Sequence, residues 1–447
     1  MRFLTAHWVL PMQGDPIKNG AVEIDGSVIK NVFTQEEFLR LNPPRQDVSD
    51  YGESIIAPGL INLHTHLEYS VLHLLDTEAS LFDWIPKLMA QVKTWTPEQF
   101  VSSATLGAQQ MVRFGTTCIL DSSFSGYAAV GAARAGLRAI VGLEMFSVID
   151  KDADLVWDRL NARKADLLRR LDSNELDGFG KTADAIAKGV ILLSVAPHAP
   201  YTVGPALTAK AMRWAESNRV AWTMHIAESP QERRWIESAD SHLDAYLQKV
   251  HTFPDGKIEN IYWRGSGKSP VRHLADHDLL QPGLVAAHVV QVDDDDILLL
   301  AKHDVAVAHC PRSNARLRSG LAPVPKLLEA GVRVGFGTDS AASTDDLNVL
   351  AEARFSWHVH RAVQPSFPYS AEDAIRRLTV EAAKAIGMSD SIGTLERGKW
   401  ADIAIFNISS ACAVARERPY DVLLWGNHPV AAVFVGGEKV LENDLYL

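Results

Sequence analysis

Cysteine is scarce in this chain, with Cys118, Cys310 and Cys412 the only three among 447 residues. Three thiols that lie far apart cannot build a disulfide framework, and this low content is typical of a reducing compartment. Long apolar runs are also missing, since no stretch approaches the ~18 residues of a transmembrane helix. The short apolar start of the chain has no small-residue cleavage site after it and favours a strand over a signal peptide. We therefore expect a cytoplasmic protein without a membrane span.

Positive charge is in short supply as well. Lysine and arginine total 44 against 55 acidic residues, which gives a formal net charge of −11, and no local basic patch offsets it. Such a chain repels phosphate backbones, so nucleic acid is excluded as a partner and a small-molecule substrate is expected. Hydrophobic residues make up 47% and charged residues 22%. This composition and length suit a large α/β barrel with an additional domain.

The centre of the chain alternates between short apolar runs and helical patterns. Near-continuous apolar strands separated by helices are typical of a parallel sheet that is buried on both faces. Eight such units predict a closed (β/α)8 barrel. The eight runs span 54–64, 115–122, 137–146, 189–198, 220–228, 283–291, 304–311 and 332–340.

One of the intervening helices can be predicted in detail. Thr96 can cap it, Pro97 suits its first position and Gln99 completes a capping box, while Gly115 ends it. A single apolar face follows at helical spacing, formed by Phe100, Ala104, Ala108 and Met111.

The two ends of the chain have a different character. Residues 1–57 alternate around an Asp25-Gly26 turn, and residues 392–447 carry glycine turns between β-branched runs. Both patterns are typical of antiparallel strands. We therefore expect β-rich ends around a barrel at 58–391. Residues 242–270 are longer and looser than an ordinary connection, and we interpret them as an inserted, lid-like loop over the barrel mouth.

Histidine is concentrated where the predicted strands end. In such barrels the chemistry lies at the carboxyl ends of the strands. An imidazole at the end of an apolar strand is costly to bury, so the pattern needs a reason. Six of the 16 histidines fall at five of the eight strand ends, accompanied by three acids: His64, His66, His198, His225, His288, His309, Asp121, Glu144 and Asp339.

A divalent metal would supply that reason. His64 and His66 lie two apart on one strand and therefore face the same side, while His225 and Asp339 arrive from two other strands. Three neutral imidazoles and one carboxylate suit Zn²⁺, and also Fe²⁺ or Ni²⁺, and leave a position for water. The fourth strand ends in "VAPH", without a lysine or an extra carboxylate for a second ion. We predict one metal, with zinc preferred.

Each of these residues also has a structural interpretation. His198, His288 and His309 could bond to neighbouring backbone, and Asp339 could cap the next helix. For the acids at the ends of the second and third strands, Asp121 and Glu144, pairing with surface cations is the preferred interpretation. The convergence of four residues of the right chemistry on one barrel face favours the metal.

Several motifs resemble a known family. "PGLINLHTH", "HIAE", "HCPRSN" and "GTDSAASTDDL", together with the β-rich ends, look like the amidohydrolase superfamily and its mononuclear deaminase and chlorohydrolase branch, which includes the methylthioadenosine/S-adenosylhomocysteine deaminases. The resemblance implies a TIM barrel that carries a small β-sandwich built from both termini. By the same similarity, the residues that match the metal ligands are His64, His66, His225 and Asp339. Glu228 and His288 match the acid/base pair, and His198 matches a substrate-contacting histidine.

The resemblance further implies hydrolytic deamination of an adenine nucleoside derivative with release of ammonia. In that reaction Asp339 and His288 would orient or deprotonate the attacking water. Glu228 would carry a proton to the ring nitrogen and then to the leaving ammonia. Burial should raise the pKa of Glu228 so that it is neutral when it donates. Trp84 is expected to line the substrate pocket.

The substrate is less clearly indicated. Adenosine-type deaminases of this branch often carry an acidic residue, on the helix after "FxxW", that holds the ribose. The corresponding stretch here, "LFDWIPKLMAQVKTW", has Lys87 and Lys93 at those positions, and Asp83 is the nearby acid. The motifs "HTHLEYS", "FDWI" and "SPVRHL" are similar to those of aminodeoxyfutalosine deaminases. The benzoate arm of that substrate could pair with Lys93 or an arginine.

Other activities stay open at this point. They are deamination of guanine, cytosine or a triazine, hydrolytic dechlorination, and, from a different class, a non-catalytic metal-containing binding protein. Relatives in this branch suggest a homodimer by analogy alone. Glu68 is assigned no role.

Overall fold

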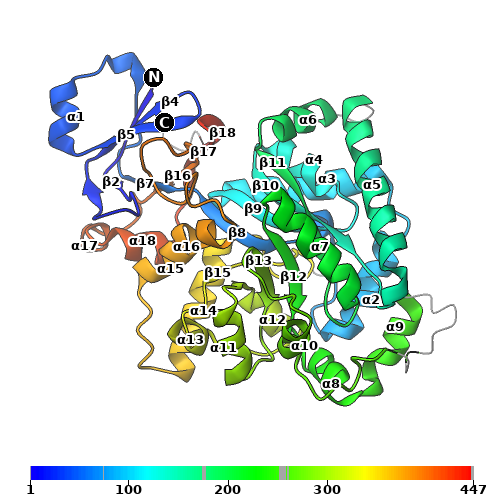
Figure 1. Cartoon of the computed structure of the whole chain (residues 1–447). Helices are drawn as coiled ribbons and strands as arrows, with labels where there is room; N and C mark the ends of the chain where they lie inside the picture. The colour runs from blue at the N-terminus through cyan, green and yellow to red at the C-terminus, as the bar shows by residue number, and fades with distance from the viewer. Residues whose placement is uncertain (1, 74, 174–177, 251–257, 259–260, 444–447) are drawn as a thin grey trace.

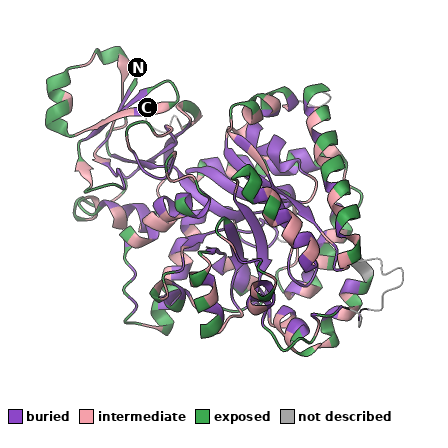
Figure 2. Ribbon diagram, viewed as in Figure 1, coloured by how far each residue is buried: buried purple, intermediate pink, exposed green. Residues whose placement is uncertain are grey.

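The computed structural model describes residues 2–73, 75–173, 178–250, 258 and 261–443. Figure 1 shows both chain ends together in one lobe, beside a larger lobe in which parallel strands are surrounded by helices. Buried residues concentrate in those central strands, and the surrounding helices turn exposed faces outward (Figure 2). Among the described residues, no helix combines the length and apolar character that crossing a membrane requires.

The first lobe contains two sheets to which both ends of the chain contribute. One has the order β5-β4-β1-β6 and the other the order β18-β17-β16-β7-β2-β3. The predicted Asp25-Gly26 hairpin is confirmed, because β4 pairs antiparallel with β5. The strands are β1 Arg2–Thr5, β2 Trp8–Val9, β3 Ile17–Lys18, β4 Ala21–Asp25, β5 Val28–Phe33, β6 Val48–Asp50, β7 Ser54–Pro58, β16 Ile403–Asn407, β17 Val430–Val435 and β18 Glu438–Glu442.

Side chains from both sheets share one hydrophobic cluster. Leu4 and Ile24 of the first sheet and Ile56 and Phe434 of the second belong to it and are almost fully buried. The two sheets therefore share part of their buried apolar surface.

The eight strands predicted for the centre are all present. They form two parallel four-stranded sheets, β11-β10-β9-β8 and β12-β13-β14-β15. The first predicted run divides at Gly59, since residues 54–58 join the terminal sheet and only the part from residue 60 enters the centre. The central strands are β8 Leu60–Thr65, β9 Thr116–Ser123, β10 Arg138–Met145, β11 Ile191–Pro197, β12 Trp222–Ile226, β13 Leu284–His288, β14 Ala306–His309 and β15 Val334–Phe336.

The two central sheets meet at both edges through few contacts between described residues. At one edge the amide of His225 donates to the carbonyl of His198 over 2.9 Å. At the other, Thr65 and Asp339 form a single parallel bridge, and the Asp339 amide donates to the His64 carbonyl over 3.0 Å. These contacts join the ends of the strands that carry the predicted site.

Helices cover the outer faces of the central strands. The predicted cap of α3 is confirmed, with Thr96 and Gln99 forming the capping box and Gly115 leaving the helix at φ +84°. The helices with central positions in the chain are α2 Leu81–Val92, α3 Pro97–Arg113, α4 Ala128–Ala135, α5 Ala153–Ser173, α6 Phe179–Ala187, α7 Pro205–Asn218, α8 Pro230–Ser238, α9 Asp244–Val250, α10 Pro270–Asp276, α11 Asp294–Lys302, α12 Pro311–Arg316, α13 Val324–Glu329, α14 Val349–Val363, α15 Ala371–Leu378 and α16 Val380–Ala385. The lobe of both chain ends adds α1 Gln35–Leu41, α17 Ala413–Arg416 and α18 Pro419–Trp425.

The segment expected to be a loop at 242–270 is partly helical. Residues 244–250 form α9, because Leu243 and Leu247 are spaced to bury one face of a helix. Residues 261–269 contain neither helix nor strand. Residues 251–257 and 259–260 of the expected lid-like insertion lie outside the described residues.

Candidate metal centre and active site

The ends of the central strands bring four histidine rings together. The ring of His64, on β8, lies 5.0 Å from that of His66, 4.8 Å from that of His225 and 5.4 Å from that of His288, measured between centroids. All four side chains are buried. Burial lowers the pKa of His64, His66 and His225 below the ordinary value, which favours the neutral imidazoles that a metal requires.

The tautomers of two of these histidines are fixed by the backbone. His66 Nδ1 lies 2.8 Å from the carbonyl oxygen of Ser122, and His225 Nδ1 lies 2.8 Å from that of His198. A carbonyl oxygen can only accept, so both Nδ1 atoms carry the proton and both Nε2 atoms carry a lone pair. The two Nε2 atoms lie 3.1 Å apart. Two lone pairs facing at this distance repel unless a cation lies between them.

Asp339 completes this arrangement after β15. Its Oδ1 lies 3.6 Å from His66 Nε2 and 3.8 Å from His64 Nε2. Both ring nitrogens of His64 are buried without a hydrogen-bond partner in the described structure. Ligand nitrogens of a tetrahedral zinc site lie about 3.3 Å apart, so the donor set fits a divalent cation. Two groups of potential ligands fall here, His64–His66–Asp339 and His64–His225–His288.

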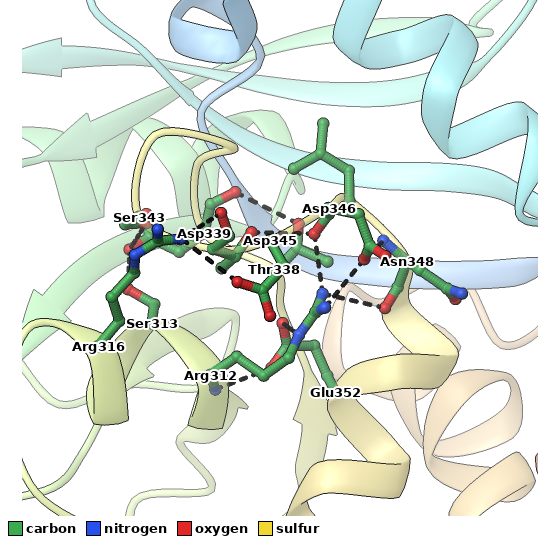
Figure 3. Close-up of polar contacts among 12 residues, drawn as sticks. Arg312, Ser313, Arg316, Thr338, Asp339, Ser343, Asp345, Asp346, Asn348 and Glu352 are labelled. Carbon is green, nitrogen blue, oxygen red and sulfur yellow. Dashed lines mark hydrogen bonds and ion pairs between the residues drawn. The ribbon is translucent and has the colours of Figure 1, made fainter. Parts of the chain in front are cut away.

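Hydroxyl groups hold the second oxygen of Asp339. Ser313 Oγ donates to Asp339 Oδ2 over 2.6 Å, and Ser343 Oγ donates to the same atom over 2.9 Å (Figure 3). With Oδ2 bound in this way, Oδ1 is left to face the histidines. Outer contacts of this kind orient a ligand and tune its affinity for metal.

An arginine beside Ser313 anchors the loop that follows Asp339. The Arg312 guanidinium donates to Glu352 Oε1 over 2.7 Å and to Asp346 Oδ1 over 2.9 Å, and it also reaches the Asp346 carbonyl over 2.8 Å (Figure 3). Glu352 is fully buried on α14. This network ties α12, the loop and α14 together and so fixes the backbone around Asp339.

The backbone at the site is tightly constrained. Gly337 lies so close to β8 that a Cβ there would fall 2.7 Å from the His64 Cβ and 2.9 Å from the His64 nitrogen and oxygen. His288 and Asp339 adopt left-handed φ values of +74° and +57°. Such values are unfavourable for residues other than glycine and often occur at functional sites, where they aim a side chain.

Glu228 and His288 face one another next to the candidate ligands. His288 Nε2 lies 3.8 Å from Glu228 Oε1. His288 Nδ1 lies 2.8 Å from Asn314 Oδ1, which can only accept, so Nε2 is the unprotonated nitrogen. Burial is the main cause that raises the pKa of Glu228 to about 7, against the opposing effect of His288. Glu228 can therefore hold a proton near neutral pH, and His288 can receive one.

A cavity of about 440 Å³ opens onto this group. His66, His198, His225, Glu228 and His288 line one part of it, and His198 Nδ1 is 2.8 Å from Thr202 Oγ1. Glu144, Thr202, Asp339 and Ser340 add further polar groups to the lining. Most of the other lining residues are apolar or aromatic: Tyr69, Leu81, Trp84, Ile85, Leu88, Met89, Phe124, Phe146, Tyr201, Tyr246 and Leu317. Trp84 and His198, the residues expected to contact substrate, both line this cavity.

The lysines considered as partners for an anionic substrate arm lie elsewhere. Lys87 pairs with Asp76, and Lys93 is exposed at the end of α2. Asp83 is also exposed and accepts from Ser80 Oγ over 2.6 Å. Within the described part of the chain, no lysine or arginine lines the cavity.

The interpretation of Asp121 and Glu144 as partners of surface cations is wrong. Both are almost fully buried, because the apolar strands β9 and β10 carry them inward. Asp121 Oδ2 accepts from the Leu67 amide over 2.8 Å. Burial raises the pKa of Asp121, and burial, followed by the charge of Glu68, raises the pKa of Glu144 to about 8.

Two further residues left open by the sequence have clear positions. Glu68 accepts from the Ser125 amide over 2.9 Å, from Ser125 Oγ over 2.7 Å and from the Ala128 amide over 3.2 Å, so it anchors the start of α4. His309 is fully buried, and its ring lies 5.7 Å from that of His360, so it belongs to the packing behind β14.

Sequence reasoning missed the residues that support the site. Ser313 and Asn314 hold Asp339 and His288, and Ser343 adds a second hydroxyl. The motif "HCPRSN" contained the signal, because polar side chains that directly follow a strand end in a barrel lie beside the neighbouring strand ends.

The sequence is similar to those of known proteins along almost its whole length. The profile of the amidohydrolase family matches residues 55–440. A 5-methylthioadenosine/S-adenosylhomocysteine deaminase of Symbiobacterium thermophilum is 32% identical over 95% of this chain and 87% of its own length. A 5'-deoxyadenosine deaminase of Methanopyrus kandleri is 30% identical over 94% of this chain and 89% of its own.

A solved structure agrees with these relatives. The crystal structure of an adenosine deaminase from Xanthomonas campestris with bound zinc has a TM-score of 0.77 at 26% identity and covers 98% of this chain and 92% of its own. The fold is therefore of the TIM-barrel type, and a divalent metal fits both this likeness and the donor set described above.

Proposed function

The chain belongs to the amidohydrolase family, and on that premise we propose that it is a metal-dependent aminohydrolase that deaminates adenine nucleosides. Water adds to the ring carbon that bears the amino group, the carbon–nitrogen bond breaks, and ammonia and a 6-oxopurine nucleoside are released. The observation that carries this proposal is the pair of facing lone pairs on His66 and His225, set beside the acid/base pair Glu228 and His288.

The proposed ligands are His64, His66, His225 and Asp339, and the proposed ion is a single zinc. The bound zinc of the adenosine deaminase from Xanthomonas campestris supports this choice, as do the neutral imidazoles and single carboxylate. When bound, the ion would supply Lewis acidity for activating water.

The protein groups then divide the proton transfers. His288 presents an unprotonated Nε2, fixed by Asn314, and is suited to take a proton from the attacking water together with Asp339. Burial raises the pKa of Glu228 to about 7, so a protonated fraction is present near neutral pH. It can therefore donate to the ring nitrogen and later to the departing amino group.

The distal cavity wall suits an uncharged substituent on the sugar. Apolar and aromatic side chains from α2 and neighbouring loops line it, and no cation of the described residues reaches it. Burying an unpaired carboxylate there would be costly. We therefore favour 5'-methylthio- and 5'-deoxyadenosine over substrates with an amino-acid or benzoate arm. The names of relatives include both compounds, and the name of one of them also includes S-adenosylhomocysteine, so the choice rests on the cavity wall.

Ammonia release from a panel of purified substrates tests the proposal. The panel contains 5'-methylthioadenosine, 5'-deoxyadenosine, S-adenosylhomocysteine, aminodeoxyfutalosine, guanine, cytosine and an amino- or chlorotriazine, with chloride release followed for the last. We expect turnover of the first two. A panel without turnover would contradict an aminohydrolase and would favour a metal-containing binding protein.

Metal content tests the ligand set independently of activity. His225→Ala should bind substantially less zinc than the parent protein, as measured by elemental analysis after gel filtration. His273→Ala is the matched control, since His273 is buried against Trp263 outside this group. A full equivalent of zinc in His225→Ala would contradict the assignment.

The finer architecture is part of the proposal. We infer that the eight central strands close into one barrel and that residues 1–57 and 392–447 form a β-sandwich domain beside it. The contacts of Thr65 with Asp339 and of His225 with His198 support closure, and the cluster shared by the terminal sheets supports the sandwich.

A further inference from the structure

Glu144, at the end of β10, presents a carboxyl group that the protein itself does not satisfy. The residue is 4% exposed and lines the active-site cavity. Its Oε1 is buried and has no hydrogen-bond partner among the described residues. An unpaired buried acceptor is costly, so a group that is retained in this state is expected to find its partner in a ligand.

The neighbouring cation bonds to main-chain oxygens and not to the Glu144 carboxyl, and its Nε has no partner among the described residues. Arg163, the closest cation by its electrostatic effect, donates to the main-chain carbonyl of Glu144 over 2.6 Å and to that of Phe124 over 2.9 Å. Glu68 is saturated by Ser125 and Ala128. Both acids are buried, but their environments differ. Glu68 has hydrogen-bond partners inside the protein, whereas Glu144 lines the cavity.

Glu144 also comes within 4.8 Å of nitrogen atoms of His198 and His225. These three groups do not suit a second metal ion. His225 Nδ1 donates to the His198 carbonyl, and its Nε2 faces His66 in the centre described above. His225 therefore has no free lone pair for another cation. A hydrogen-bond donor on the substrate is the remaining partner for the Glu144 carboxyl.

We propose that Glu144 binds the vicinal hydroxyls of the substrate's sugar, an inference that rests on the proposed action on nucleosides. The carboxyl has two oxygens, and adjacent hydroxyls can donate to it or accept from it, so the match holds whether or not Glu144 is protonated. Glu144 is thereby a positioning residue for the reacting ring. The helix α2 does not provide such an acid, because Asp83 is exposed.

The order of the strands supports this position. Glu228 follows β12 and His288 ends β13, whereas Glu144 lies on β10, on the other side of β11 and His198. The proposal places the amino-bearing carbon of the purine at Glu228 and His288 and its sugar toward β10, an orientation that the substrate pair below tests. Of the three acids that line the cavity, Glu144, Glu228 and Asp339, only Glu144 lacks a role in the chemistry.

A matched pair of substrates tests the proposal. The enzyme is assayed with 5'-deoxyadenosine and with 2',3',5'-trideoxyadenosine, which lacks both hydroxyls. In the parent protein, loss of the diol should lower kcat/KM by about 10- to 100-fold, the range expected for hydrogen bonds to a carboxyl group. In Glu144→Ala the diol substrate should lose a similar factor, largely through KM, and the trideoxy substrate should change little.

Two further variants keep the outcome interpretable. Glu144→Gln preserves shape and one acceptor and should fall between the parent and Glu144→Ala. Glu68→Gln, the control for loss of a buried carboxylate, should affect both substrates by the same factor. Equal losses for both substrates in the Glu144 variants would overturn the proposal, as would two equivalents of bound zinc in the parent but one in Glu144→Ala. If the parent deaminates neither nucleoside, the proposed function itself is wrong.

Discussion

His288 Nε2 and Glu228 Oε1 lie 3.8 Å apart at the ends of neighbouring strands. Asn314 fixes the tautomer of His288. Burial raises the pKa of Glu228 to about 7, so part of this carboxyl is protonated near neutral pH. The two groups can therefore serve as a base and an acid in one reaction.

Glu228→Gln should abolish turnover and leave the metal in place. The amide keeps the shape of the side chain but cannot deliver the carboxyl proton, and loss of an acid/base group costs about 10²- to 10⁴-fold in kcat. Ammonia release and zinc content, measured on one preparation, check this. A variant that retained activity would show that another group carries the proton.

The pH dependence of kcat should show the raised pKa of Glu228. The reaction needs the protonated form, so with a folded-state pKa of about 7 kcat should fall as pH rises through that value, by about tenfold per unit at higher pH. Rates at saturating substrate between pH 6 and 9 measure the profile. A flat profile over this range would contradict Glu228 as the donor.

Ser313→Ala should weaken metal binding. Ser313 Oγ orients Asp339 through a 2.6 Å hydrogen bond, and loss of such an outer contact costs about 10- to 100-fold in metal affinity. Competition with a zinc chelator measures the change. Ser356→Ala is the control, because Ser356 is buried on α14 and its hydroxyl has no partner among the described residues. Equal affinities in the two variants would remove Ser313 from the support of Asp339.

Gly337→Ala should disturb both stability and the metal centre. The new methyl group would fall within 2.9 Å of the His64 backbone, and overpacking of this kind costs about 1–3 kcal/mol. Urea unfolding and zinc affinity should both decline, since β15 and β8 must separate and carry Asp339 away from His64. A variant with parental stability and affinity would show that the strands can separate without cost.

Much of the centre could be predicted from local pattern. Each strand is a short apolar run, and several end in or are followed by a candidate site residue, so the placement of His64, His66, His225 and Asp339 at strand ends follows from periodicity and barrel geometry. The homodimer, which came from analogy alone, stays a prediction.

The sequence by itself determined which side chains end the strands, because strand and helix patterns depend on residues close together in the chain. Only the tertiary structure decided their chemical states. The carbonyls of Ser122 and His198 set the tautomers of His66 and His225. Glu144 was expected to pair with a surface cation, but segments distant in the chain bury it, and it lines the cavity. Hydrogen-bond partners and solvent exclusion come from contacts between segments far apart in the chain, and no local pattern encodes them.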